Sequence, residues 1–227
     1  MARLNLLETG IFTVADAARL IRSSEQKIRG WIAGYPRRGE PILQNELGAL
    51  DGKLAFSFLN LMEMRFLAFF ADEGIHLNSL RYMAREAQKI LKRPHPFATN
   101  TLFKTDGKKI YAEIIERSGD KKLYNLYARN FEMAPVIERT LKEEIIYDPA
   151  GVARHWRPRP DLAPNIIIHP KRAFGQPTFK ESGVPVRALF GALESGETVK
   201  SVARWFDVPE QHVREAEKFC RDLALAA

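Results

Sequence analysis

The sequence predicts an α+β protein that is mostly helical. We expect a winged helix-turn-helix at the front, a small mixed middle region with β-hairpins, and a helical helix-turn-helix-like domain at the rear. Two observations predict this order: similar helical patterns lie near both ends, and Asp-Gly turns lie between short apolar runs. The chain has 227 residues, of which 45% are hydrophobic, so it can bury real cores.

Two stretches align without a gap: "TVADAARLIRSSEQKIR" from Thr13 and "TVKSVARWFDVPEQHVR" from Thr198, with seven of seventeen positions identical. In the first, Thr13 and Ser24 can cap two short helices. Val14, Ala17, Ala18 and Ile21 fall on one helical face, which is typical of a helix-turn-helix. The second stretch repeats this pattern from Thr198.

The exposed face of the second helix separates the two copies. In the first copy it offers Gln26, Lys27 and Arg29, opposed only by Glu25. Such side chains read base edges or hold phosphates in a major groove. In the rear copy we place these residues on that face: Glu210, Gln211, His212, Arg214, Glu215, Glu217 and Lys218. Three carboxylates would repel phosphate, so we expect the rear copy to make protein contacts. An ordinary packed helix pair remains the alternative for both.

The segment after the first copy predicts a basic hairpin and two long helices. "GYPRRGEPILQNELGALDGKLAF" has an Asp-Gly turn at Asp51 and carries Arg37, Arg38 and Lys53. Ser57 can cap a helix to about Ala71, and another helix follows from about Asn78. With "GIHLNSLR" between the helices, residues 11–92 resemble the MerR-type winged helix. The resemblance implies DNA binding but no metal sensing, because no cysteine pair is present.

We therefore expect DNA contacts from the helix caps, the second helix and the hairpin: Thr13, Ser24, Gln26, Lys27, Arg29, Arg37, Arg38 and Lys53. The charge distribution agrees with this placement. The net charge is +7. Residues 1–98 hold 14 basic and 10 acidic side chains, residues 99–160 hold 12 and 9, and residues 161–227 hold 9 of each. An anionic partner should bind the first two thirds.

The middle of the chain is predicted to be mixed. "LFKTDGKKIYAEI" suggests a hairpin at Asp106–Gly107, "MAPVIERTLKEEI" a helix, and "IIYDPAGVARHW" a hairpin between Asp148 and Gly151. Lysines 108, 109, 121 and 122 are either solvated loop charges or phosphate contacts. We divide the chain into residues 1–98, a connecting region 99–157, a proline-rich linker 158–165 and a rear domain 166–227.

The rear segment is similar to a helix-turn-helix family catalogued as domain of unknown function four-three-three. The shared letters are Gly175, Pro177, Phe179, Val184, Pro185, Val186 and Gly196. With the MerR-like front and the strand-containing middle, the whole chain resembles the long VapB-type antitoxins. This resemblance implies a type II antitoxin that represses its own operon and neutralises a PIN-like ribonuclease toxin by direct contact. It also implies a homodimer on double-stranded operator DNA.

We expect the toxin or dimer contact in the arginine-rich segment from Arg154 to Pro164, the turn near Phe174, and the rear helices. An arginine there can fork onto the carboxylates of a nuclease site. The expected contact residues are Arg154, Trp156, Arg157, Arg159, Phe174, Pro177, Val184, Trp205 and Phe206. The alternative for the arginine-rich segment is a stiff spacer with solvated cations.

No catalytic, metal or cofactor site is predicted, and we expect no enzyme. The five histidines have no metal-ligand spacing, and His95 and His169 each precede a proline in an expected turn. The single cysteine, Cys220, agrees with a cytoplasmic protein. The longest apolar run is too short to span a membrane. Two rival functions stay open: a MerR-like regulator that responds to a small ligand without a toxin partner, and a structural adaptor.

Overall fold

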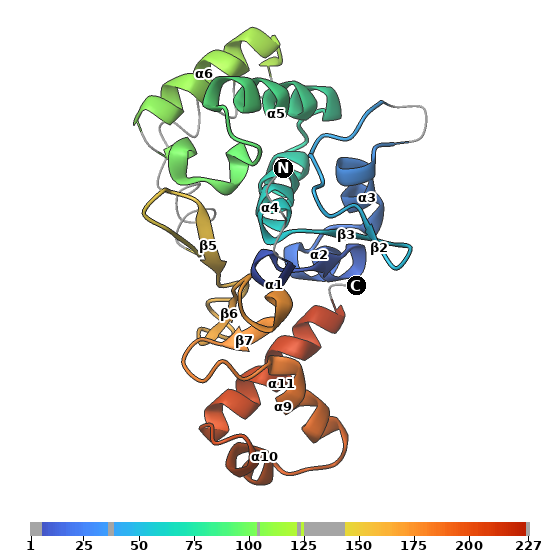
Figure 1. Cartoon of the computed structure of the whole chain (residues 1–227), viewed down its shortest axis with the longest axis vertical. Coiled ribbons are helices and arrows are strands. Elements are labelled where there is room, and N and C mark those ends of the chain that lie inside the picture. The colour runs from blue at the N-terminus through green and yellow to red at the C-terminus, as the bar shows by residue number, and fades with distance from the viewer. Residues whose placement is uncertain (1–5, 36–38, 104, 122–123, 125–143, 226–227) are drawn as a thin grey trace.

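The computed structural model describes residues 6–35, 39–103, 105–121, 124 and 144–225. These residues form helices and two small antiparallel sheets, which confirms the α+β, mostly helical class (Figure 1). The predicted segments Arg37–Arg38 and "MAPVIERTLKEEI" lie outside them, apart from the last two letters of the latter. Nothing in the fold tests the expected domain boundaries, which stay a prediction.

The front of the chain contains three short helices and a three-stranded sheet of order β1-β3-β2. Its elements are α1 (Leu6–Thr9), β1 (Phe12–Thr13), α2 (Val14–Ile21), α3 (Glu25–Ala33), β2 (Ala49–Leu50) and β3 (Lys53–Phe56). The β2–β3 hairpin turns at Asp51 and Gly52, where φ is 48° and 72°. Positive φ at both central residues is the geometry that an Asp-Gly pair favours.

Two long helices follow, α4 (Phe58–Asp72) and α5 (Leu77–Leu91). Ser57 caps α4 as expected, because its side chain accepts the backbone N–H of Asn60 at 3.2 Å. Helix α4 is buried on most of its sides, so it forms the centre of the front half. Two short 3-10 helices then lead from α5 to the next long helix: η1 (Pro96–Ala98) and η2 (Asn100–Phe103).

The expected hairpin at Asp106–Gly107 is wrong. Helix α6 (Thr105–Ser118) runs through both residues. An aspartate in the first turn of a helix is stabilised by the positive end of the helix dipole, so Asp-Gly does not by itself require a hairpin. Ile114 and Ile115 are buried, which anchors the helix to the core.

The second sheet has the order β4-β5-β6-β7, and all its pairs are antiparallel. Its strands are β4 (Ile145–Tyr147), β5 (Ala153–Trp156), β6 (Ile166–Ile168) and β7 (Pro177–Phe179). The β4–β5 pair confirms the hairpin predicted between Asp148 and Gly151. Three helices complete the rear: α9 (Val186–Glu194), α10 (Val199–Trp205) and α11 (Glu210–Leu225).

The proline-rich segment 158–165 is a loop between two paired strands. Trp156 on β5 pairs with Ile168 on β6, so a single sheet continues across the segment. Pro158 and Ala163 are buried, whereas Asp161, Leu162 and Pro164 are exposed. The segment is therefore packed against the protein at several points, in contrast to an extended spacer.

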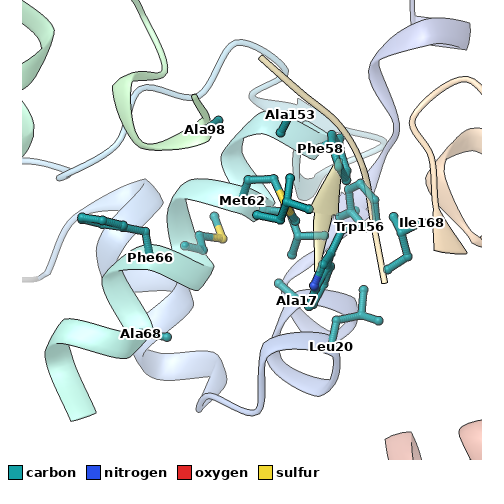
Figure 2. Close-up of a cluster of buried hydrophobic side chains, with 14 of the residues drawn as sticks. Ala17, Leu20, Phe58, Met62, Phe66, Ala68, Ala98, Ala153, Trp156 and Ile168 are labelled. Carbon is teal, nitrogen blue, oxygen red and sulfur yellow. The ribbon is translucent and has the colours of Figure 1, made fainter. Parts of the chain in front are cut away.

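The hydrophobic core also crosses this loop. Figure 2 shows Trp156 beside Ile168, with Ala17 and Leu20 of α2 and Phe58 and Met62 of α4 around them. Trp156 is 2% exposed. Burying an aromatic side chain of this size contributes about 1.5–3 kcal/mol of stability. The core thus joins the front helices to the second sheet.

Candidate functional site

The two similar segments fold into the same local structure. Arg22 and the equivalent Asp207 both have left-handed φ angles, 53° and 51°. In each copy the next residue donates its N–H across the turn at 3.0 Å, from Ser23 to the Ala18 carbonyl and from Val208 to the Ala203 carbonyl. The repeat in the sequence is therefore a repeat of one helix–turn–helix geometry.

Caps fix the start of each helix in the first copy. Thr13 and Asp16 form a reciprocal capping box: the Thr13 N–H donates to Asp16 Oδ2 at 2.9 Å, and the Asp16 N–H donates to Thr13 Oγ1 at 3.2 Å. Ser24 accepts the N–H of Lys27 at 3.3 Å. Ile28, Trp31 and other apolar residues are buried, so the inner faces of α2 and α3 are fixed.

The polar face of α3 is presented to solvent. Gln26 and Arg29 are exposed. Arg29 pairs with Glu25 one turn earlier at 3.3 Å, and Lys27 reaches Asp72 of α4 at 3.1 Å. Exposed pairs of this kind contribute about 0–1 kcal/mol, so phosphate can compete for the cations.

Of the hairpin cations, Lys53 is exposed at the start of β3. Lys53 and the exposed side chains of α3 thus give the front half of the chain polar groups on its surface. This arrangement does not test DNA binding, so the role of Lys53 and of the α3 side chains in DNA binding stays a prediction.

The corresponding face in the rear copy differs from our expectation. We placed His212 and Glu215 on it, but both are buried, at 9% and 5% exposure. The His212 ring stacks on Phe179 of β7, with centroids 4.5 Å apart. Glu215 accepts hydrogen bonds from Asn165 at 2.9 Å and Gln211 at 3.2 Å. The sheet covers this side of α11, which a helix-only view of the sequence could not reveal.

The arginine-rich segment is divided between the surface and the interior. Arg154 is exposed on β5, and Arg157 is half-buried. We expected Trp156 in an irregular, exposed segment; the structure corrects this, because Trp156 lies on β5 and belongs to the core. Its indole N–H donates to Glu144 at 3.3 Å, and the Arg65 guanidinium lies 5.4 Å from its ring centroid.

Arg159 is also directed inward, which corrects the expectation of an exposed cation. Its side chain is 11% exposed and pairs with Asp222 of α11 at 2.7 Å. Its Nη atoms donate to the carbonyls of Leu20 at 2.9 Å and Arg19 at 3.2 Å. A cation at the carbonyl end of α2 is stabilised by the helix dipole. Arg159 thus joins the loop, the front helix pair and the last helix.

The remaining expected contact residues form two separate groups. Phe174 is 54% exposed in the short 3-10 helix η3 (Ala173–Gly175), and Pro177 and Val184 nearby are half-buried. Trp205 is 58% exposed at the end of α10, next to the half-buried Phe206. Large exposed aromatics are enriched at protein interfaces, so both groups remain candidates for a protein contact.

A buried ionic cluster beneath the hairpin was missed by the sequence reasoning. His95 Nδ1 lies 2.9 Å from Glu63 and His95 Nε2 lies 3.3 Å from Glu46, in the segment that leads into the hairpin. Burial opposes a charge on His95, but the hydrogen bonds to Glu46 and Glu63 outweigh it and raise the pKa of His95 to about 10. A charged histidine therefore holds the hairpin segment against α4. A sequence signal was present, since Glu63 and Arg65 are the two charged residues in the apolar run from Phe58 to Phe70.

Neither a metal site nor a membrane span is found in the part of the chain that the structure describes. No group of three His, Cys, Asp or Glu side chains there could hold a metal ion. None of the described helices combines the length and apolar character needed to cross a bilayer.

Comparison with known proteins finds that this chain is similar to a protein named as an antitoxin. Residues 166–220 match a family described as Protein of unknown function (DUF433), which confirms the resemblance of the rear segment. Over 224 residues the chain is 25% identical to a Mycobacterium tuberculosis protein named "Putative antitoxin VapB45"; the match covers 91% of this chain and 92% of that one.

A solved structure agrees with this similarity. The crystal structure of Rv2018 from Mycobacterium tuberculosis superimposes with a TM-score of 0.68 at 25% identity. The match covers 90% of this chain and 96% of the other. The protein therefore resembles an antitoxin of the VapB type over most of its length.

Proposed function

We propose that this protein is the cytoplasmic, non-enzymatic antitoxin of a type II toxin–antitoxin system. It represses its own operon by binding operator DNA as a homodimer, and it neutralises a PIN-like ribonuclease toxin by direct contact. The observation that carries the proposal is the similarity to a named antitoxin over nine tenths of both chains. The geometry supports it, because separate surfaces are available for DNA and for protein.

The DNA-binding surface is assigned to α3 and the β2–β3 hairpin, arranged as a MerR-like winged helix. Gln26 and Arg29 are exposed on α3 and suited to read base edges, and Lys53 is suited to hold a phosphate. Thr13 and Ser24 position the helices through their caps. A two-fold dimer would place two copies of α3 on paired half-sites.

The protein contacts are assigned to the two exposed aromatic groups. Trp205 with Phe206 serves the dimer, whereas Phe174 with Arg154 and Arg157 faces the toxin. Arg159 and Trp156 are not part of this assignment, because both are committed to the interior.

Co-expression with the product of the adjacent gene tests the toxin half. We expect the two proteins to purify together and growth to be restored, and we expect Arg154→Ala with Arg157→Ala to weaken both effects. Arg117→Ala with Arg221→Ala, which removes two exposed arginines outside the assigned surfaces, is the control. Absence of a complex with the wild-type protein would contradict the proposal.

A second function, regulation by a small ligand, is favoured by one observation. An open cleft of about 650 Å³ lies between the α2–α3 turn and the end of α11, and it is lined by Arg19, Arg22, Ser23, Ser24, Asp222 and other residues. A ligand there would touch the helix pair directly. Transcription that changes with a ligand, without any toxin partner, would favour this MerR-like regulator.

A further inference from the structure

Two histidine rings lie together on the second sheet, beside Arg154 of the surface assigned to the toxin. The pairing of Trp156 with Ile168 places His155 on β5 opposite His169, which follows β6. The ring centroids are 6.0 Å apart, and the ring planes differ by 19°. Both side chains are half-buried.

The charged groups around this pair are basic. Arg154, Lys180 and Arg172 act on His155, and Arg172, Arg154 and Lys171 act on His169. All four cations are exposed. Arg172 donates to the Lys180 carbonyl at 2.7 Å. Only Lys171 has a carboxylate partner among the described residues, namely Glu8 of α1 at 2.8 Å. The face therefore concentrates positive charge that the described chain does not neutralise.

The two imidazoles are uncharged at neutral pH. Burial and the neighbouring cations lower the pKa of His155 to about 4, and the same causes lower the pKa of His169. The geometry agrees, because His169 Nδ1 accepts the N–H of Lys171 at 3.1 Å and is therefore not protonated. A carboxylate that arrives beside the rings would favour their protonated forms.

We propose that the face formed by Arg154, His155, His169, Arg172 and Lys180 binds a carboxylate-rich segment of a partner protein and takes up protons as it binds. Carboxylates placed against the face would pair with the arginines and stabilise the imidazolium forms. Affinity then rises as the pH falls. The face shares Arg154 with the proposed toxin surface, but the inference concerns the chemistry of the bound segment and its proton uptake, which do not require that partner to be a toxin.

The placement of the face favours a protein over nucleic acid. In Figure 1 strands β6 and β7 lie on the other side of α2 from α3, so a duplex read by α3 would not cover this sheet. The exposed Phe174 ring follows Arg172 by two residues and adds an apolar contact. Arginine and aromatic side chains together are typical of protein interfaces.

Binding of labelled decaglutamate to the full-length protein tests the inference, with oligouridylate of ten nucleotides as the nucleic-acid probe. Fluorescence anisotropy at pH 7.5 and pH 6.0 should show peptide binding that is at least about threefold tighter at pH 6.0, where glutamate is still largely ionised. Arg154→Ala with Lys180→Ala should weaken peptide binding about tenfold, the loss of roughly 1.4 kcal/mol. Lys121→Ala with Lys218→Ala, which removes the same charge from exposed positions elsewhere, should not.

Two further measurements separate the parts of the inference. His155→Gln with His169→Gln should abolish the pH dependence while keeping binding at pH 7.5, and calorimetry of the wild type in two buffers should detect proton uptake. Binding without proton uptake, or equal losses in both lysine-containing double variants, would overturn the proposal. Tighter binding of oligouridylate that is lost in Arg154→Ala with Lys180→Ala would overturn the choice of a protein partner. None of these outcomes depends on whether a toxin is found.

Discussion

Arg159 and Asp222 form an ion pair of 2.7 Å between the proline-rich loop and the last helix. Asp222 also pairs with Arg22 at the α2–α3 turn, at 2.5 Å. Burial opposes the charge on Asp222, but the hydrogen bonds from the two arginines lower its pKa. One carboxylate therefore connects the front helix pair, the loop and the rear helix.

Loss of Arg159 should destabilise the protein more than loss of Arg22. Arg159→Ala leaves Asp222 and two α2 carbonyls with fewer partners in a half-buried site, so we expect a loss of about 2–4 kcal/mol. Arg22 has a side chain that is 60% exposed, and Arg22→Ala should cost less than about 1 kcal/mol. Urea denaturation measures both. Equal losses would show that the interior contacts of Arg159 add nothing.

His95 should make stability fall in alkaline solution. Its folded pKa of about 10 lies above the unfolded value near 6.5. The contribution of His95 is therefore complete below about pH 6.5 and is lost as the pH rises through about 10. Denaturation of the wild type at pH 6.5, 8 and 9.5 should show this decline, and His95→Gln should have a flatter profile. If the stability of both proteins declines in parallel with pH, groups other than His95 cause the decline.

Arg29 and Arg214 provide a matched pair for the DNA contact, because they occupy equivalent positions and each pairs with a glutamate four residues earlier. Arg29→Ala should weaken operator binding by roughly 1–3 kcal/mol and relax the base preference at one position. Arg214→Ala should leave binding unchanged. Titration of a labelled upstream fragment measures both, and equal effects would refute the assignment of roles.

Lys53 should act on DNA of any sequence. Since it is placed to neutralise a phosphate, Lys53→Ala should weaken binding uniformly and reduce the slope of log affinity against log salt by about 1. Affinities at several salt concentrations, for operator and unrelated duplexes, supply the slope. A loss confined to the operator would instead make Lys53 a base contact.

Trp205 should matter for assembly and little for folding. Its side chain is 58% exposed, so Trp205→Ala removes few interior contacts. We expect the variant to become monomeric at concentrations where the wild type is dimeric, with an unchanged melting temperature. Light scattering gives the mass. If the variant is still dimeric, the dimer interface does not depend on Trp205 of α10.

Local features were predictable where one or two residues dominate the energetics. The Ser57 and Thr198 caps, the Asp51–Gly52 turn and the start of α4 follow from backbone groups that these side chains satisfy. The same reasoning failed at Asp106–Gly107, because Asp-Gly is compatible with a first helical turn when the following apolar residues have helical spacing.

Interactions between distant parts of the chain were not predictable. The sequence could not show that β5 pairs with β6, and so Trp156 and Arg159 were expected at the surface although both are turned inward. His95 and Glu63 lie 32 positions apart, and only packing of η1 against α4 brings them into contact. Residues exposed on a single element, such as Gln26 and Arg29, were easier to place because helical periodicity alone decides their direction.

The pairing of β5 with β6 has a consequence for how the protein would be degraded by proteases. The exposed tip of the loop, around Asp161, Leu162 and Pro164, is a natural site for a protease. A cut there would break the covalent connection but not the sheet or the Arg159–Asp222 pair, so the two halves would stay together as a nicked protein. The rate at which the protein is degraded would therefore depend on how often the sheet opens. The cut alone would leave the proposed DNA-binding and protein-binding surfaces intact.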